Sequence, residues 1–119
     1  MNIVILEGTL SSEPVLRTLS SGSLLHQFEV TTRDAEVAST VPVAWFDPAV
    51  PPTFTKGSSV VVVGTVRRRF FRGAGGTQSR TEVVATEVLP STKKAKVNRV
   101  LRRQAEILGG AAGADVRSV

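Results

Sequence analysis

The chain has 119 residues, which fits one domain of ordinary size with a single buried core. Hydrophobic residues make up 41% of the sequence and charged residues 21%, so wholesale disorder is excluded. There is no cysteine, which excludes a disulfide scaffold, a thiolate metal site and a thiol nucleophile. We expect no signal peptide, because residues 1–10 lack a basic segment followed by a long apolar one. Apolar runs such as Val60–Val63 are too short to span a membrane.

The net charge of +5 is distributed unevenly along the chain. Residues 1–90 contain eight Lys/Arg and eight Asp/Glu, so they are neutral, and residues 91–119 carry the whole excess. Within the neutral part, residues 67–80 contain five arginines and no acidic residue. This cluster predicts a local anionic partner, although a solvated charged hairpin would have the same composition.

Five segments have the alternation and the flanking turn residues of β-strands: 2–10, 24–33, 41–46, 59–71 and 80–89. Between them we expect a polar loop at 34–40, a proline-rich connection at 47–56 and a flexible hairpin tip at 72–79. Phe54 is the one large apolar residue of the connection and is predicted to fill the core. The pattern predicts an all-β fold, either a small closed barrel or a sandwich.

The first strand carries apolar side chains on both faces. Val4 and Leu6 lie on one face, and Ile3 and Ile5 lie on the other. A second copy of the chain would cover the outer face, so Ile3 and Ile5 are predicted to lie at an oligomer interface.

After Pro90 the composition changes, and we divide the chain into a domain at 1–90 and a basic tail at 91–119. Residues 93–108 have apolar side chains at helical spacing and predict a basic amphipathic helix. The small and polar residues 109–119 predict disorder.

No group of residues in the sequence has the composition of a catalytic centre. The single histidine, His26, lies among apolar residues and is interpreted as a strand residue with a local hydrogen bond. Residues 56–58 lack the glycine spacing of a phosphate-binding loop, and the acidic residues are scattered. We therefore expect no enzymatic activity, no metal and no cofactor.

The clearest functional signal is at the end of the fourth strand. Alternation places Arg67, Arg69 and Phe71 on one face, and Arg68 and Phe70 on the other. Arginines neutralise phosphates and an exposed aromatic ring stacks on an unpaired base, so this face predicts contact with a single-stranded nucleic acid. The alternative is burial of the aromatic ring at an oligomer contact, which is favoured for Phe70.

Phe46 has the opposite parity to Val41, Val43 and Trp45, which are the expected core residues of the third strand. Phe46 is therefore predicted to point outward. Base stacking and a purely structural role are both open for this ring.

Several segments resemble bacterial single-stranded DNA-binding proteins in their order and spacing, over about residues 1–90. They are Asn2–Leu10, Glu13–Arg17, Ser21-Gly22 leading to Phe28–Thr32, Lys56–Ser58, Gly64–Arg69 and Thr81–Ala85. The resemblance implies a five-stranded OB-fold barrel, here followed by a basic, partly helical or disordered C-terminal tail. It also implies assembly as a homotetramer and binding of single-stranded DNA without strong sequence preference.

The resemblance also implies site residues by position. Arg67 and Arg69 match two strand cations, Phe46 and Phe71 match stacking aromatics, and Lys56 matches a lysine that contacts the DNA backbone. Three further arginines complete the predicted DNA-binding set: Arg33, Arg72 and Arg80. The implied roles are DNA replication, recombination or repair, with replication or repair proteins as partners, in the cytoplasm at the nucleoid. No membrane contact is expected, and the basic tail is expected to add electrostatic affinity for DNA.

The chain departs from the family pattern at several positions. The tryptophan usual after the second strand is missing, Thr40 replaces the tryptophan that opens the third strand, and Pro42 replaces an arginine. Residues 47–52 are proline-rich where the family has a helix, and the tail lacks the acidic tip through which the family recruits partner proteins. These departures indicate a divergent paralogue with weaker DNA binding per subunit. Two other interpretations remain open: a primosome-type accessory OB protein, and an OB-fold assembly module whose DNA face has decayed.

Overall fold

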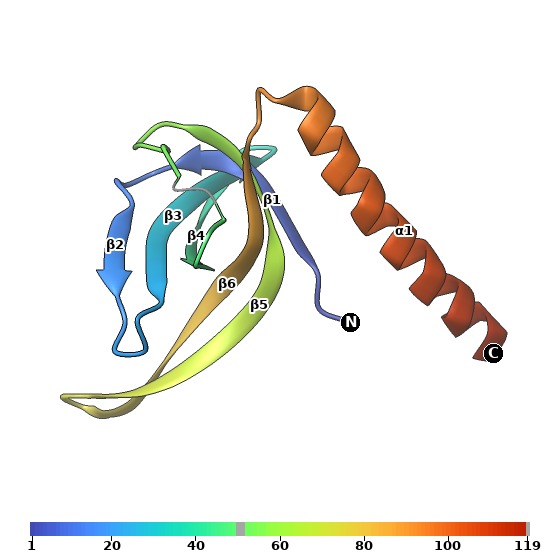
Figure 1. Ribbon diagram of the computed structural model, residues 1–119. Helices are drawn as coiled ribbons and strands as arrows, with labels where there is room; N and C mark the ends of the chain where they lie inside the picture. Colours follow the sequence, from blue (N-terminus) through green and yellow to red (C-terminus); the bar gives the residue numbers. More distant parts are fainter. Residues whose placement is uncertain (50–51, 119) are drawn as a thin grey trace.

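The computed structural model describes residues 1–49 and 52–118, with side chains described up to residue 110. Six strands are followed by one helix (Figure 1). They are β1 (Val4–Leu10), β2 (Val15–Thr18), β3 (Leu24–Asp34), β4 (Val37–Phe46), β5 (Ser59–Gly73), β6 (Gly76–Pro90) and α1 (Lys94–Ser118).

The sheet closes on itself into a barrel of five strands. Its strand order is β1-β5-β6-β4-β3-β2, and β1 also pairs with β3, with Leu10 opposite Val30. The pairing of β4 with β6, at Val43 and Val83, is parallel, and the other pairings are antiparallel. β2 pairs with β3 as an added edge strand. This connectivity confirms the predicted five-stranded OB-fold barrel.

Aliphatic side chains fill the barrel, because alternate residues of each strand point inward. The buried cluster consists of Leu10, Phe28, Val30, Val43, Val60, Val62, Val83, Ala85 and Val88. Trp45 and Phe54 are partly buried and pack against this cluster, which confirms both as core residues. Full burial of each large aliphatic or aromatic side chain contributes about 1.5–3 kcal/mol to folding.

The strands are longer than predicted, and the prediction of a polar loop at 34–40 is wrong. β3 runs to Asp34 and β4 begins at Val37, so Ala35 and Glu36 form a tight turn, with Ala35 at φ 55°. The tip expected at 72–79 is also mostly strand, because β5 ends at Gly73 and β6 begins at Gly76. Polar composition did not exclude these ladders, since a two-stranded ribbon in solvent can carry polar side chains on both faces.

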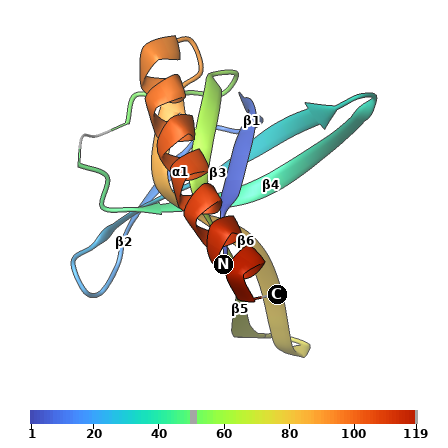
Figure 2. The same cartoon turned by 90° about the vertical axis from the view of Figure 1, so that its right-hand side faces the viewer.

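The helix α1 begins close to the predicted start and continues through the segment that was predicted to be disordered. Residues 111–115 include three alanines, and alanine readily extends a helix that has already formed. Val97 and Val100 are buried at 8% and 4% exposure, so the first turns of α1 pack on the barrel, and the helix then extends away from it (Figures 1 and 2). Among the described residues, no helix combines the length and apolar character needed to cross a bilayer.

A β-bulge between Val63 and Gly64, with Thr86 as the extra residue of β6, precedes the part of the β5–β6 ribbon that leaves the barrel. The register shifts between Val63 and Gly64, and the hydroxyl of Thr86 donates a 3.0 Å hydrogen bond to the Val63 carbonyl. A Cβ atom at Gly64 would overlap the backbone carbonyl of Val84. Bulges bend the strand and increase its twist, so the ribbon beyond this point curves away from the barrel. In Figure 1 it projects to the lower left.

We predict that Gly64→Ala destabilises the protein, because the added methyl group forces the two strands apart at the bulge. The expected loss is about 2 kcal/mol of unfolding free energy, typical of overpacking. Urea unfolding of the variant and of the parent protein measures this loss of free energy. Gly75→Ala is the control, because a Cβ atom there meets nothing within 4 Å. Equal unfolding midpoints for the two variants would contradict the prediction.

Candidate nucleic-acid interface

The two faces of the β5–β6 ribbon carry different sets of side chains. On one face Arg67 lies opposite Glu82 and Arg69 lies opposite Arg80. On the other, Arg68 donates a 3.2 Å hydrogen bond to the hydroxyl of Ser79, and its guanidinium lies 5.2 Å from the centroid of the Phe70 ring. The alternation predicted from the sequence is therefore present in the structure.

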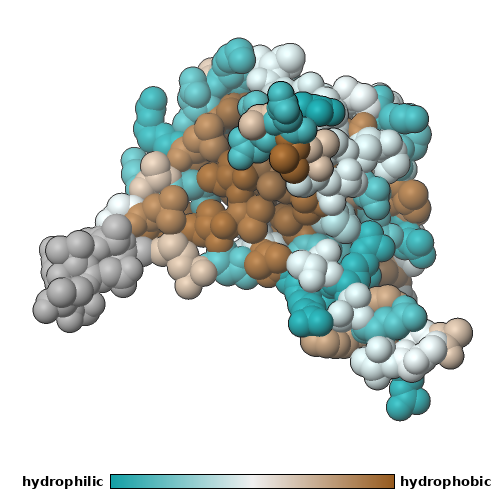
Figure 3. Space-filling view, turned by 180° about the vertical axis from the view of Figure 1, so that it is seen from behind, coloured by the Kyte–Doolittle hydropathy of each residue, from teal (hydrophilic) through white to brown (hydrophobic). Residues whose placement is uncertain are grey.

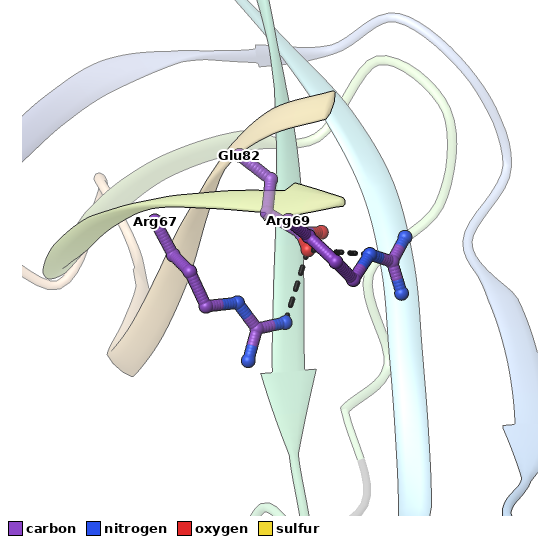
Figure 4. Close-up of polar contacts among 3 residues, drawn as sticks. All are labelled: Arg67, Arg69 and Glu82. Atoms are coloured by element: carbon purple, nitrogen blue, oxygen red, sulfur yellow. Dashed lines mark hydrogen bonds and ion pairs between the residues drawn. The ribbon is translucent and has the colours of Figure 1, made fainter. Parts of the chain in front are cut away.

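A buried carboxylate holds two of the predicted DNA-binding arginines together (Figure 4). Glu82 is 2% exposed, and its Oε1 accepts a 3.0 Å hydrogen bond from Arg67 Nη2. The same oxygen lies 3.5 Å from Arg69 Nε. Both arginine side chains are 42% exposed, so each has atoms left to face solvent. One anion between two cations fixes both side chains and leaves a net charge of +1 in the group.

Phe46 lies beside this group on the outside of β4. Its side chain is half-buried, and the guanidinium of Arg67 lies 5.5 Å from the centroid of its ring. The predicted outward orientation agrees with this contact, since Arg67 is itself on the outer face. The cation–π contact gives Arg67 a second support and occupies one face of the ring.

A groove of about 450 Å³ lies next to the two arginines, between the ribbon and the β2–β3 pair. Phe71, at 43% exposure, forms part of its wall together with three cations. The lining residues are Arg17, Leu19, Leu25, Gln27, Arg69, Phe71 and Arg80. The groove therefore combines an exposed aromatic ring with converging guanidinium groups, which suits a phosphate chain with unstacked bases.

Arg17 is the charged groove residue that the sequence analysis missed. It lies on β2 opposite Leu25 of β3, and β2 is a short strand with four exposed residues that was not predicted. The segment Glu13–Arg17 already belonged to the resemblance. Its pairing with β3 is what brings the Arg17 side chain to the groove.

Three predicted DNA-binding residues lie neither in the groove nor beside it. Lys56 is in a turn, where its backbone N–H donates a 3.1 Å hydrogen bond to Glu13. Arg33 lines a separate hollow of about 360 Å³, together with Glu7. Arg72 has the strand parity of Arg68 and Phe70, so it belongs to the other face of the ribbon. The structure thus brings Arg69, Phe71 and Arg80 together, with Arg67 and Phe46 alongside.

The remaining hollows differ from the groove in their lining. One of about 410 Å³ has Lys93 and Lys96 beside apolar residues such as Phe54. A hollow of about 570 Å³ beside Phe46 has Asp47 and Glu87 among its lining residues. Across the part of the chain that the structure describes, no three His, Cys, Asp or Glu side chains are grouped so as to hold a metal ion.

We predict that the double variant Arg67→Ala/Arg69→Ala loses about 3 kcal/mol of unfolding free energy, because Glu82 would remain buried without a cation. Adding Glu82→Gln should restore much of this stability and none of the DNA affinity. Thermal unfolding and oligonucleotide binding of the double and triple variants measure the two effects. A triple variant no more stable than the double one would show that the arginines do not compensate the charge of Glu82.

Comparison with known families agrees with this geometry. The model of the single-strand binding protein family matches residues 1–91, which include the whole barrel and the ribbon. Comparison with curated proteins gives no match to this chain. The family match spans most of the sequence, and its OB-fold barrel carries an arginine-lined groove with an exposed phenylalanine. The chain therefore belongs to the single-strand binding protein family, and it binds single-stranded DNA.

Proposed function

We propose that the protein binds single-stranded DNA without sequence preference and protects it during DNA replication, recombination or repair. The observation that carries the proposal is the groove in which Arg17, Arg69 and Arg80 surround the exposed ring of Phe71. The proposed activity is binding without catalysis, in the cytoplasm at the nucleoid.

The proposed mode of binding separates two tasks. The guanidinium groups contact phosphates, which are the same at every nucleotide and carry no sequence information. Phe71 stacks on one base, and every base has a face that can stack. Arg67 and Arg69 meet the strand already oriented, because Glu82 holds them in place before binding. Little side-chain entropy is then lost when the strand binds.

One observation favours an OB-fold assembly module with a weakened DNA face. Phe46 is half-buried beneath Arg67, so Phe71 is the open aromatic ring of the groove. A site with one stacking ring gains about 1–3 kcal/mol from that contact, which is modest. The affinity for single-stranded DNA therefore separates a functional binder from a scaffold that has lost its ligand.

We predict that single-stranded DNA binds much more tightly than duplex DNA, and that Phe71→Ala weakens this binding by roughly 1–3 kcal/mol at any salt concentration. Stacking depends little on counterions, whereas loss of Arg69 should matter less as the salt concentration rises. Fluorescence anisotropy with oligothymidylate and with duplex DNA, at two salt concentrations, provides the measurement.

Phe70→Ala is the matched control, because Phe70 is 63% exposed on the other face of the same ribbon. A larger loss with Phe70→Ala would place the DNA on that face. Equal affinity for single-stranded and duplex DNA would rule out the proposed function.

We further propose self-association through the outer face of β1, as a homotetramer. Ile5 is 40% exposed and Ile3 is half-buried, while the neighbouring Val61 and Val63 are buried at 2%. Glu87, opposite Val63 on β6, forms a 3.6 Å ion pair with Arg103 of α1, so α1 contacts the barrel part of β6 there. Seen from behind, apolar side chains gather over the middle of the molecule (Figure 3).

We predict that Ile5→Lys lowers the oligomeric state, because a lysine on this face would lose its hydration in the interface. Light scattering measures the mass in solution. Val37→Lys, at a 66% exposed position on the β3–β4 hairpin, is the control and should leave the assembly unchanged. A monomeric parent protein at micromolar concentration would contradict the proposal.

A further inference from the structure

The densest positive charge outside the groove lies on α1 and the residue before it. Six Lys/Arg side chains between residues 93 and 103 are exposed, and Glu106 is the one acidic residue between 94 and 110. The six are Lys93, Lys94, Lys96, Arg99, Arg102 and Arg103. We propose that α1 is a second phosphate-binding surface, which contacts the part of a bound single strand that extends beyond the groove. This inference rests on the proposed function.

Helical spacing gathers four of these residues into one strip. At about 100° per residue, Lys96, Arg99, Arg102 and Arg103 lie within an arc of about 120°. Val97 and Val100 fall outside this arc and are buried on the barrel. Arg99 and Arg102 therefore face away from the barrel. Lys96 and Arg103 lie at the edge of the strip nearer the barrel, where Lys96 lines a hollow with Phe54 and Arg103 pairs with Glu87. Glu106 lies within the same arc.

The strip is fixed relative to the barrel before DNA binds. Val97 and Val100 attach the first turns of α1, and the ion pair of Arg103 with Glu87 adds a polar contact at 3.6 Å. Glu87 partly neutralises Arg103, so we assign phosphate contact to Lys96, Arg99 and Arg102. A docked helix spares the strand the cost of ordering a flexible tail.

The strip and the groove lie on parts of the molecule that diverge. Figure 1 shows the ribbon extending to the lower left and α1 extending to the lower right, and Figure 2 shows both running downward. A short strand that fills the groove would not reach α1. A longer strand would reach it after curving around the barrel.

The chemistry of α1 indicates contact with the DNA backbone alone. The helix contains no aromatic residue, so it offers no ring on which a base could stack. Insertion into a lipid surface would need the apolar side of the helix, where Val97 and Val100 are buried against the barrel and Ile107 and Leu108 are the exposed apolar side chains. Binding at α1 should therefore depend strongly on salt and weakly on base identity.

The test compares two lengths of oligothymidylate on the full chain: one of about 8 nucleotides, within the site size of one OB fold, and one of about 40. In the triple variant Lys96→Ala/Arg99→Ala/Arg102→Ala, the longer strand should bind more weakly at low salt. For the longer strand, the slope of log affinity against log salt concentration should become shallower by about 2, because three phosphate contacts are lost. Affinity for the shorter strand should not change. Circular dichroism should show an intact helix, because alanine favours helix.

Two single substitutions provide matched controls. Lys94→Ala removes the same charge as Arg99→Ala but lies outside the strip, so it should weaken binding of the longer strand less. Glu106→Gln should strengthen it, because an acidic group is removed from the strip.

Each other outcome overturns the inference. Equal losses on both strands would show a general charge effect, and no loss on the longer strand would show that α1 does not contact DNA. Binding to anionic phospholipid vesicles that the triple variant abolishes, with unchanged DNA affinity, would assign α1 to a membrane surface. Failure of the parent protein to bind either strand would instead contradict the proposed function.

Discussion

The antiparallel ladder between β5 and β6 is the constraint on which the other parts of the structure depend. It runs from Val60 opposite Pro90 to Gly73 opposite Gly76. In its first half, Val60, Val62 and Val88 belong to the barrel core. Beyond the bulge at Gly64 the ladder still supplies Val83 to the core, and from Arg68 onward the same two strands continue into solvent. Because one continuous ladder forms both parts, the rigidity of the core is transmitted to the groove.

Two arginines of the ribbon repel each other because they lie at paired positions. Arg69 lies directly opposite Arg80, and like charges at opposed positions destabilise a sheet. Glu82, one pair further along the same face, offsets this repulsion because it accepts a hydrogen bond from Arg67 and lies 3.5 Å from Arg69 Nε. A buried carboxylate is costly without such partners. The arginines and the acid therefore stabilise one another, and the remaining positive charge faces the groove.

Arginines that are close in sequence have different surroundings because strands alternate. Arg67 and Arg69 contact Glu82, whereas Arg68 contacts Ser79 and lies over Phe70 on the other face. Arg80 comes from the partner strand and lines the groove. The positive charge of α1 is arranged by a period of 3.6 residues instead, and it lies on a surface that diverges from the ribbon. The molecule thus has two basic surfaces, one with an aromatic ring and one without.

The sequence by itself determined the features that depend on local periodicity. Alternation over 59–71 was enough to separate Arg67, Arg69 and Phe71 from Arg68 and Phe70, because neighbouring side chains of any strand point to opposite faces. The OB-fold barrel followed from five such strands and from the order of the segments that resemble the family, and the helix followed from its apolar spacing.

Only the tertiary structure decided which distant residues meet. Arg17 reaches the groove because β2 pairs with β3, and a four-residue exposed strand has no pattern strong enough to predict. Glu82 becomes a buried partner of two arginines because of the register between β5 and β6, which depends on a bulge that sequence periodicity does not reveal. Lys56 and Arg33 were chosen for their type and position, yet they lie outside the groove. Charge and residue type can be read along a chain, but convergence on one surface depends on strand pairing and on the packing of the whole barrel.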